Sequence, residues 1–196
     1  KRDQSVRDEP SRLVLFILRR RAAGCWLVVH PFRARSESLF AQSATKIEHE
    51  IAIDGETGWG GDTSAQPSPY LSEDGNNKIG GYSINDYSAD VDLSTTPVSI
   101  FNSERYDGKN GAPNLTYSFP VEEPGFYEVR LYMGNGYHGT PNAGDRVFDV
   151  SIEGIIAPEL DDIDLSGTYG HLVGAVVNYT AEVTDGSLDI VFLHGI

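Results

Sequence analysis

The sequence predicts an all-β domain over residues 46–196, folded as an antiparallel β-sandwich or a related jelly roll. From about Ile47 onward, short runs alternate apolar with polar residues, which is the period of a strand with one buried face. Gly, Asn, Asp and Pro separate these runs, as is typical of turns. No window carries a helical stripe longer than a turn or two, so helices are not expected to build the core.

Four runs show the alternation most clearly, within residues 114–121, 125–133, 146–154 and 187–193. One face of each strand is therefore expected to be buried. The links at 122–125 ("EEPG") and 184–186 ("TDG") have hairpin length and a glycine that tolerates positive φ, so they predict two hairpins. The expected core residues are Leu115, Tyr117, Phe119, Val121, Tyr127, Val129, Leu131, Met133, Phe148, Val150, Ile152, Leu188, Ile190 and Phe192.

Composition narrows the classes of function. The 196 residues carry a formal charge of -14, from 15 basic and 29 acidic residues. Such a chain repels a phosphate backbone and is not expected to bind nucleic acid. Its apolar runs fall short of the roughly 18 to 20 residues of a membrane-spanning helix, so no membrane span is expected. Cys25 is the only cysteine, which excludes an internal disulfide.

Residues 1–45 are interpreted as a basic leader or other non-domain segment, either disordered or an artefact of translated upstream sequence. Residues 1–46 hold ten of the 15 basic residues, only four of the 29 acidic ones and one of the 21 glycines. The stretch "AAGCWLVV" followed by "AQSA" is similar to a secretion signal, but His30, Pro31 and two arginines interrupt it. We expect this segment not to pack on the domain that begins at residue 46.

Two long loops, at 54–96 and 134–145, are the expected places for a binding site, because long loops in a compact domain usually carry function. The second, "GNGYHGTPNAGD", displays Tyr137 and His138 between glycines. Exposed planar rings suit a sugar, whose C–H faces stack on them while neighbouring amides and carboxylates bind the hydroxyls. The alternative is that Tyr137 folds back as an anchor for the loop.

Six motifs follow one another from residue 101 to the end: "FNSERYDG", "TYSFPV", "GFYEVRLYMGNGYHG", "GDRVFDVSIEG", "LDDIDL" and "VTDGSLDIVFLHGI". In this order they resemble the malectin domain, a family of carbohydrate-binding β-sandwich modules. Upstream, "GWGGDTS" around Trp59 resembles the family's Trp-to-Asp loop. The resemblance covers about residues 47–196.

The resemblance implies non-catalytic binding of a short glucose oligomer or a related glycan by loop aromatics at one end of the sandwich. Carried over one residue at a time, the expected carbohydrate-binding residues are Tyr82, Tyr106, Tyr137 and His138, with Tyr87 as the alternative to Tyr82. Malectin has phenylalanine where His138 stands, so the histidine adds a titratable donor. The family's binding aspartate and final strand would follow the last residue of this chain, so the resemblance implies a domain truncated at its C-terminus.

No cofactor and no metal is expected. Asp161, Asp162 and Asp164 offer closely spaced oxygen ligands that suit calcium, but they lack the full EF-hand pattern, and the family carries a similar acidic stretch as structure. His171 has no serine or cysteine nucleophile nearby in the sequence and is interpreted as a packed or capping histidine. The chain is therefore not expected to be an enzyme.

We expect a module of a longer extracellular or cell-envelope protein that passes through the secretory pathway and binds an oligosaccharide or polysaccharide. One alternative is a structural or adhesion spacer domain without sugar binding. Another is an accessory module of a glycoside hydrolase. The sequence leaves the sugar, its linkage and the parent protein open.

Overall fold

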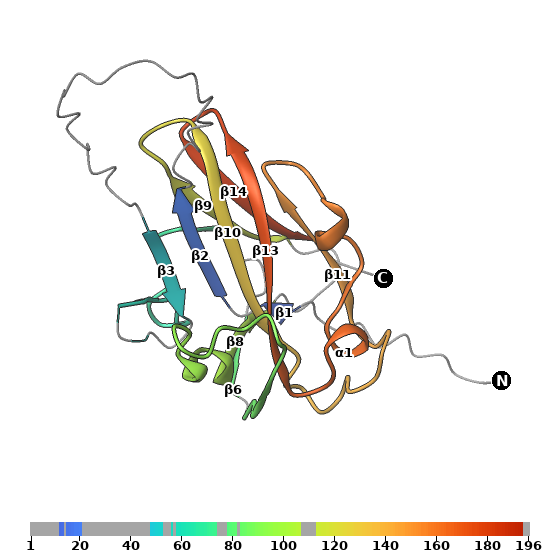
Figure 1. Cartoon of the computed structure of the whole chain (residues 1–196). Helices are drawn as coiled ribbons and strands as arrows, with labels where there is room; N and C mark the ends of the chain where they lie inside the picture. Colours follow the sequence, from blue (N-terminus) through green and yellow to red (C-terminus); the bar gives the residue numbers. More distant parts are fainter. Residues whose placement is uncertain are drawn as a thin grey trace, which may run out of the picture.

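Two sheets face each other and enclose the core (Figure 1). The computed structural model describes residues 12–13, 15–20, 48–52, 56, 58–73, 78–81, 83–106 and 113–193. One sheet has six strands in the order β4 (Gly60–Gly61), β3 (Glu48–Ala52), β2 (Leu15–Arg20), β10 (Gly125–Gly134), β13 (Val173–Val183) and β7 (Asp86–Tyr87). The other has five in the order β12 (Ile163–Asp164), β11 (Val147–Ile152), β14 (Ser187–Leu193), β9 (Leu115–Pro120) and β5 (Leu71–Glu73).

Strand pairs in both sheets are antiparallel, except that β4 and β7 run parallel to their neighbours β3 and β13. A small third sheet, in the order β1 (Arg12–Leu13), β8 (Ser103–Tyr106) and β6 (Lys78–Gly81), lies at the lower end of the molecule in Figure 1. Helical structure in the described residues is limited to η1 (Val98–Asn102), η2 (Pro158–Leu160) and α1 (Leu165–Thr168). This arrangement confirms the predicted all-β sandwich.

The residues expected on the buried faces of the four alternating runs are all buried. β10 shows the pattern most clearly, because Tyr127, Val129, Leu131 and Met133 are 0% exposed while Phe126 is 54% exposed. Burying each such side chain stabilises the fold by about 1.5–3 kcal/mol. The hydroxyl of Tyr127 is satisfied as well, because it donates to a main-chain carbonyl oxygen in the preceding turn at 2.7 Å.

Both predicted hairpins are wrong, because each link joins the two sheets instead of two paired strands. β9 lies in the five-stranded sheet and β10 in the six-stranded sheet, and the same is true of β14 and β13. A short link serves either purpose, since strands of both sheets bury one face in the same core. β14 is an interior strand of its sheet, because it pairs with β11 on one side and with β9 on the other.

The first long loop, predicted over 54–96, contains the short strands β4, β5, β6 and β7, which extend the edges of the sheets. The described residues contain no helix with the length and apolarity needed to cross a membrane.

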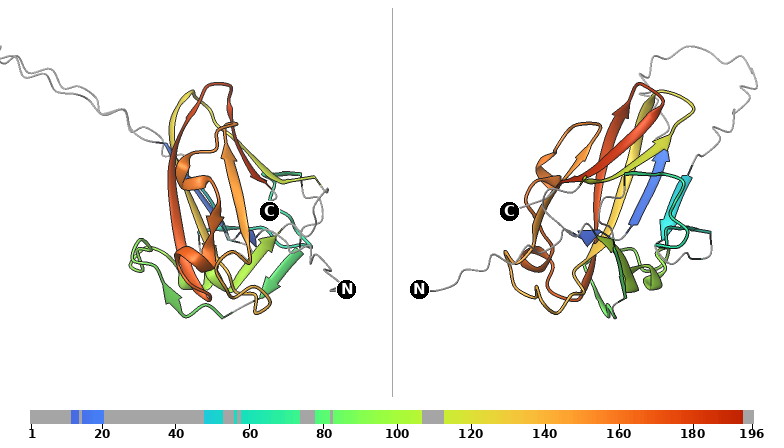
Figure 2. Two further views of the ribbon diagram at one scale, coloured as in Figure 1. Left: turned by 90° about the vertical axis from the view of Figure 1, so that its right-hand side faces the viewer. Right: turned by 180° about the vertical axis from the view of Figure 1, so that it is seen from behind.

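Part of the basic N-terminal segment lies in the six-stranded sheet. β2 pairs with β10 on one side and with β3 on the other (Figure 2). Six residues suffice for a strand, although they are too few to form a core of their own. This placement differs from the expectation that residues 1–45 do not pack on the domain, while residues 1–11 and 21–47 lie outside the described part of the chain. The boundary at residue 46 remains a prediction.

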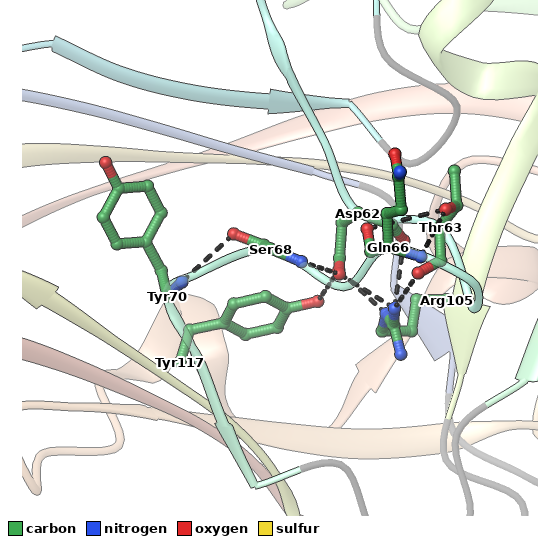
Figure 3. Close-up of polar contacts among 7 residues, drawn as sticks. All are labelled: Asp62, Thr63, Gln66, Ser68, Tyr70, Arg105 and Tyr117. Carbon is green, nitrogen blue, oxygen red and sulfur yellow. Dashed lines mark hydrogen bonds and ion pairs between the residues drawn. The ribbon is translucent and has the colours of Figure 1, made fainter.

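A buried ion pair ties the loop that follows β4 to β8 (Figure 3). The residues that form it, Asp62 and Arg105, are 0% and 2% exposed. Arg105 Nε donates to Asp62 Oδ2 at 2.8 Å, and Nη2 donates to Oδ1 at 2.8 Å. This bidentate geometry is the strongest arrangement of a guanidinium and a carboxylate. Nη2 also donates to the carbonyl oxygen of Asp62 at 3.0 Å.

Two further donors reach the carboxylate of Asp62. The hydroxyl of Tyr117 in β9 donates to Oδ2 at 2.6 Å, and the main-chain N–H of Ser68 donates to Oδ1 at 2.7 Å. These bonds offset the cost of removing a charge from water. Burial and the negative charge of Asp62 raise the pKa of the Tyr117 phenol well above its ordinary value. The network joins the loop, β8 and β9 at one buried point.

We expect Asp62→Ala to lower the free energy of unfolding by about 3–5 kcal/mol, because it leaves Arg105 buried without its ion-pair partner. Urea unfolding followed by circular dichroism measures the change. The control is Glu122→Ala, which removes an exposed carboxylate from the β9–β10 turn and should change stability by no more than about 0.5 kcal/mol. Equal stability of the two variants would contradict a structural role for the ion pair.

We expect the main-chain amides of β2 to exchange hydrogen as slowly as those of β10, because β2 has a paired strand on both sides. Hydrogen exchange followed by mass spectrometry compares peptides that cover Leu15–Arg20 and Gly125–Gly134. Exchange of the first peptide at the rate of an unpaired chain would contradict the pairing and support a segment that stays off the domain.

Candidate functional site

The loop that joins β10 to β11, residues 135–146, carries two of the predicted site residues, Tyr137 and His138. It lies at the lower end of the sandwich in Figure 1, the end at which β10 finishes and β13 begins. The side chain of Asn135 stands at the root of this loop and is 0% exposed. The loop is therefore anchored at its first residue.

Asn135 organises the loop through both ends of its amide. Its Nδ2 donates to the carbonyl oxygen of Thr140 at 2.6 Å and to the hydroxyl of Ser166 in α1 at 2.8 Å. Its Oδ1 accepts from Nη1 of Arg146 at 3.0 Å and from the main-chain N–H of Tyr137 at 3.3 Å. A fully used buried amide of this kind holds a loop in one conformation.

The ring of Tyr137 is half-buried and lies over Gly139. A Cβ at Gly139 would stand 2.2 Å from Cε1 of Tyr137, so only glycine permits this close approach. Cζ of the buried Arg146 lies 5.9 Å from the centre of the ring, within the range of a cation–π contact. The exposed ring of His138 stands beside it, with the ring centres 5.0 Å apart and the planes inclined at 51°.

The loop is also held by α1 and by the turn that precedes β13. A ring nitrogen of His171, Nε2, lies 3.1 Å from the carbonyl oxygen of Tyr137. Asp164 accepts from the main-chain N–H of Gly144 at 2.7 Å and caps α1 by accepting from that of Gly167 at 2.9 Å. His171 therefore packs as the sequence suggested, and Asp164 has a structural role.

Of the predicted site residues, the structure brings Tyr137 and His138 together. Tyr106 is the last residue of β8, is half-buried, and belongs to the third sheet at the same end of the sandwich as the β10–β11 loop (Figures 1 and 2). Tyr82 lies outside the described residues. Its alternative, Tyr87, packs its ring 5.4 Å from that of Phe101 and donates its hydroxyl to a nearby carbonyl oxygen, so it serves the core.

Two supporting residues of the site, Asn135 and Arg146, were not predicted. Arg146 is 4% exposed, which is rare for an arginine. Its signal in the sequence is a single basic residue in the acidic segment "NAGDRVFDV", directly before a strand. Asn135 offers no comparable signal, because asparagine between two glycines reads as an ordinary turn.

The structure does not bring together Asp161, Asp162 and Asp164, the three carboxylates that the sequence offered as calcium ligands. Carboxylate oxygens of Asp149, Asp161 and Asp162 lie within 4.8 Å of one another, whereas Asp164 turns to the cap of α1. Oδ1 of Asp149 accepts the main-chain N–H of Asp162 at 2.7 Å, so part of this group has a structural use.

The chain is similar to known proteins over most of its length. A family model described as "Malectin domain" matches residues 44–195. No curated protein sequence matches the chain. The solved structure of the plant receptor-like kinase FER superposes with a TM-score of 0.59 at 20% identity, over 74% of this chain and 41% of FER.

Other solved structures give the same result. The extracellular domain of ANXUR1 from Arabidopsis thaliana superposes with a TM-score of 0.58 at 20% identity, over 69% of this chain and 36% of ANXUR1. The complex of the plant peptide RALF23 with FER and LLG2 matches with a TM-score of 0.58 at 19% identity, over 74% of this chain and 40% of the matched one. This chain thus spans well under half the length of these neighbours, and at such identities the likeness shows the fold alone. By the match over residues 44–195, the chain belongs to the malectin domain family of non-catalytic β-sandwich modules.

Proposed function

We propose that this malectin domain binds carbohydrate, with glucose oligomers or related glycans as its ligands. The observation that carries the proposal is the pair of adjacent rings, Tyr137 and His138, at the end of the sandwich. Sugar C–H faces stack on such rings, and the imidazole of His138 adds a hydrogen-bonding group for a hydroxyl.

The support under the rings favours binding without a large rearrangement. Asn135 and His171 contact the main chain of Tyr137, and Arg146 lies over its ring. Because the loop is already held in place, little conformational entropy is lost in ordering it when a ligand binds. In this proposal Tyr137 takes both roles considered from the sequence: its half-buried side chain anchors the loop, and the rest of the ring contacts the ligand.

Tyr106 is proposed as a further contact on the same end of the sandwich. Its neighbour Arg105 is fixed by the bidentate pair with Asp62, which sets the position of the end of β8. Strand alternation directs Tyr106 away from the side that buries Arg105. Tyr82 follows β6 directly and remains a proposed contact by resemblance.

The proposed context is a longer extracellular or cell-envelope protein. The neighbours of known structure include the extracellular domain of a plant protein, and this chain covers 36% of it. In that context the domain anchors its parent to glycans, and an accessory role beside a glycoside hydrolase is one form of such a parent.

A second candidate function is recognition of a peptide, and a third is a spacer role without a ligand. The solved complex of FER with the peptide RALF23 favours the second, since that protein shares the fold of this chain. Glycan binding and peptide binding are separable by experiment.

We expect Tyr137→Ala to weaken the binding of a glucose oligomer by about 1–3 kcal/mol, because it removes one aromatic contact surface. Isothermal titration calorimetry with maltose and longer glucose oligomers measures the change. In the NMR spectrum of the unmodified chain, the same ligands should shift the main-chain amides of residues 135–146.

The matched control is Phe126→Ala. Phe126 is an exposed aromatic residue at the start of β10, whereas Tyr137 follows the end of that strand. The two rings therefore lie at opposite ends of the sandwich. Its removal should leave the affinity unchanged. If no sugar on a glycan array binds to the folded chain, the sugar proposal is contradicted. That result would favour the spacer or the peptide function.

A further inference from the structure

Strand β13 has an edge that stays open along most of its length. On that side its partner β7 pairs only with Val173 and Gly174, whereas β13 continues to Val183. Among the described residues no further strand pairs with this edge. An open edge offers a row of main-chain N–H and C=O groups to another chain.

The pairing with β7 identifies the groups that point outward. The carbonyl oxygen of Gly174 accepts the N–H of Ser88 at 2.8 Å, so Gly174 faces the open side. Strand alternation directs the N–H and C=O of Asn178, Thr180 and Glu182 to the same side. All three residues are exposed or half-buried, and within the described chain no main-chain group bonds to them on this side.

Two pockets that share Glu159 and Asn178 lie along this part of β13, and together they are called the groove. The larger, about 420 Å³, lies between β13, η2 and α1, and the smaller, about 320 Å³, is lined by Asn178 and Thr180 and by Glu128 of β10. Figure 1 shows η2 beside β13 on the side away from β10. Val176 and Ile163 supply apolar surface to the larger pocket.

The groove is acidic. No lysine or arginine is among its lining residues, which all belong to the described chain. Arg130, which the register places opposite Asn178, is bound by Glu128 at 2.7 Å. Among the carboxylates that line the groove, Glu128 is paired with Arg130. The charge offered to a ligand therefore comes from Asp90, Glu159, Asp161 and Asp162.

We infer that the open edge of β13 binds an extended basic peptide by strand addition. The main chain of the peptide pairs with the outward groups of Asn178, Thr180 and Glu182, while its lysine or arginine side chains face the carboxylates of the groove. Charge complementarity selects this occupant over a second copy of the chain, because two acidic edges repel each other. The site lies on the side of the sandwich and does not depend on the sugar proposal.

The test uses an eight-residue peptide of alternating lysine and valine with blocked ends. Titrated into the isotopically labelled chain, it should shift the amide signals of Asn178, Thr180 and Glu182, and its affinity should fall as salt is added. A second peptide with N-methyl groups on alternate residues keeps the charge but lacks the pairing donors. It should bind at least roughly tenfold more weakly, as expected when several main-chain hydrogen bonds are lost.

Two variants of the chain test each part of the site. Thr180→Pro removes an outward N–H that does not bond to β10. It should lower the affinity for the lysine–valine peptide about as much as N-methylation of the peptide does. Glu159→Gln should weaken it and reduce its salt dependence, whereas Glu122→Gln, an exposed carboxylate in the β9–β10 turn, should not. If Thr180→Pro does not fold, the methylated peptide on the unaltered chain decides the question.

Equal binding of the two peptides would overturn the inference, because charge attraction alone would then explain it. Shifts confined to residues outside β13 and the groove would overturn it as well. Self-association of the chain that Thr180→Pro abolishes would identify a second copy as the occupant, and shifts of the same amides by glucose oligomers would identify a glycan. Both results would contradict the peptide.

Discussion

The buried pair of Asp62 and Arg105 is the constraint on which the lower end of the sandwich depends. A loop, a strand of the third sheet and a strand of the five-stranded sheet meet at one carboxylate. An isolated charge at this depth would be too costly to retain, so the donors around it must all be in place together. The pair therefore specifies how the loop after β4 crosses the end of the core, more than it adds net stability.

The same end of the molecule contains a second buried arginine with a different partner. Arg146 meets the amide of Asn135 and the ring of Tyr137, whereas Arg105 meets a carboxylate. The polar groups around Arg105 bond to one another and serve only the fold. The polar groups around Arg146 hold a loop that carries the exposed ring of His138. The buried groups therefore hold the loop that carries the proposed sugar contacts.

The sequence predicted the strands well and their connections poorly. Period-two alternation identified the buried faces of β9, β10, β11 and β14, because burial of one face is a local property of a strand. Whether a short link joins paired strands or crosses between sheets depends on the whole fold. The links "EEPG" and "TDG" were therefore predicted wrongly as hairpins. β2 was missed because its apolar run is short, ends in Arg19 and Arg20, and needs a neighbouring sheet in order to form a strand. At the site, Tyr137 and His138 could be predicted because their rings stand between glycines in a long loop, whereas the roles of Asn135 and Arg146 depend on burial that the whole fold creates.

The most direct test of the buried network is the ionisation of Tyr117. Burial, the negative charge of Asp62 and the hydrogen bond to Asp62 raise the pKa of this phenol in the folded chain well above the ordinary value of 10.0, which it regains on unfolding. Below pH 10 this difference costs the folded state nothing, and above it the free energy of unfolding should fall by about 1.4 kcal/mol per pH unit for this one proton. Ultraviolet titration should therefore show one tyrosine that ionises only as the chain unfolds, and Tyr117→Phe should remove it. Reversible ionisation of Tyr117 near pH 10 in the folded chain would contradict the network.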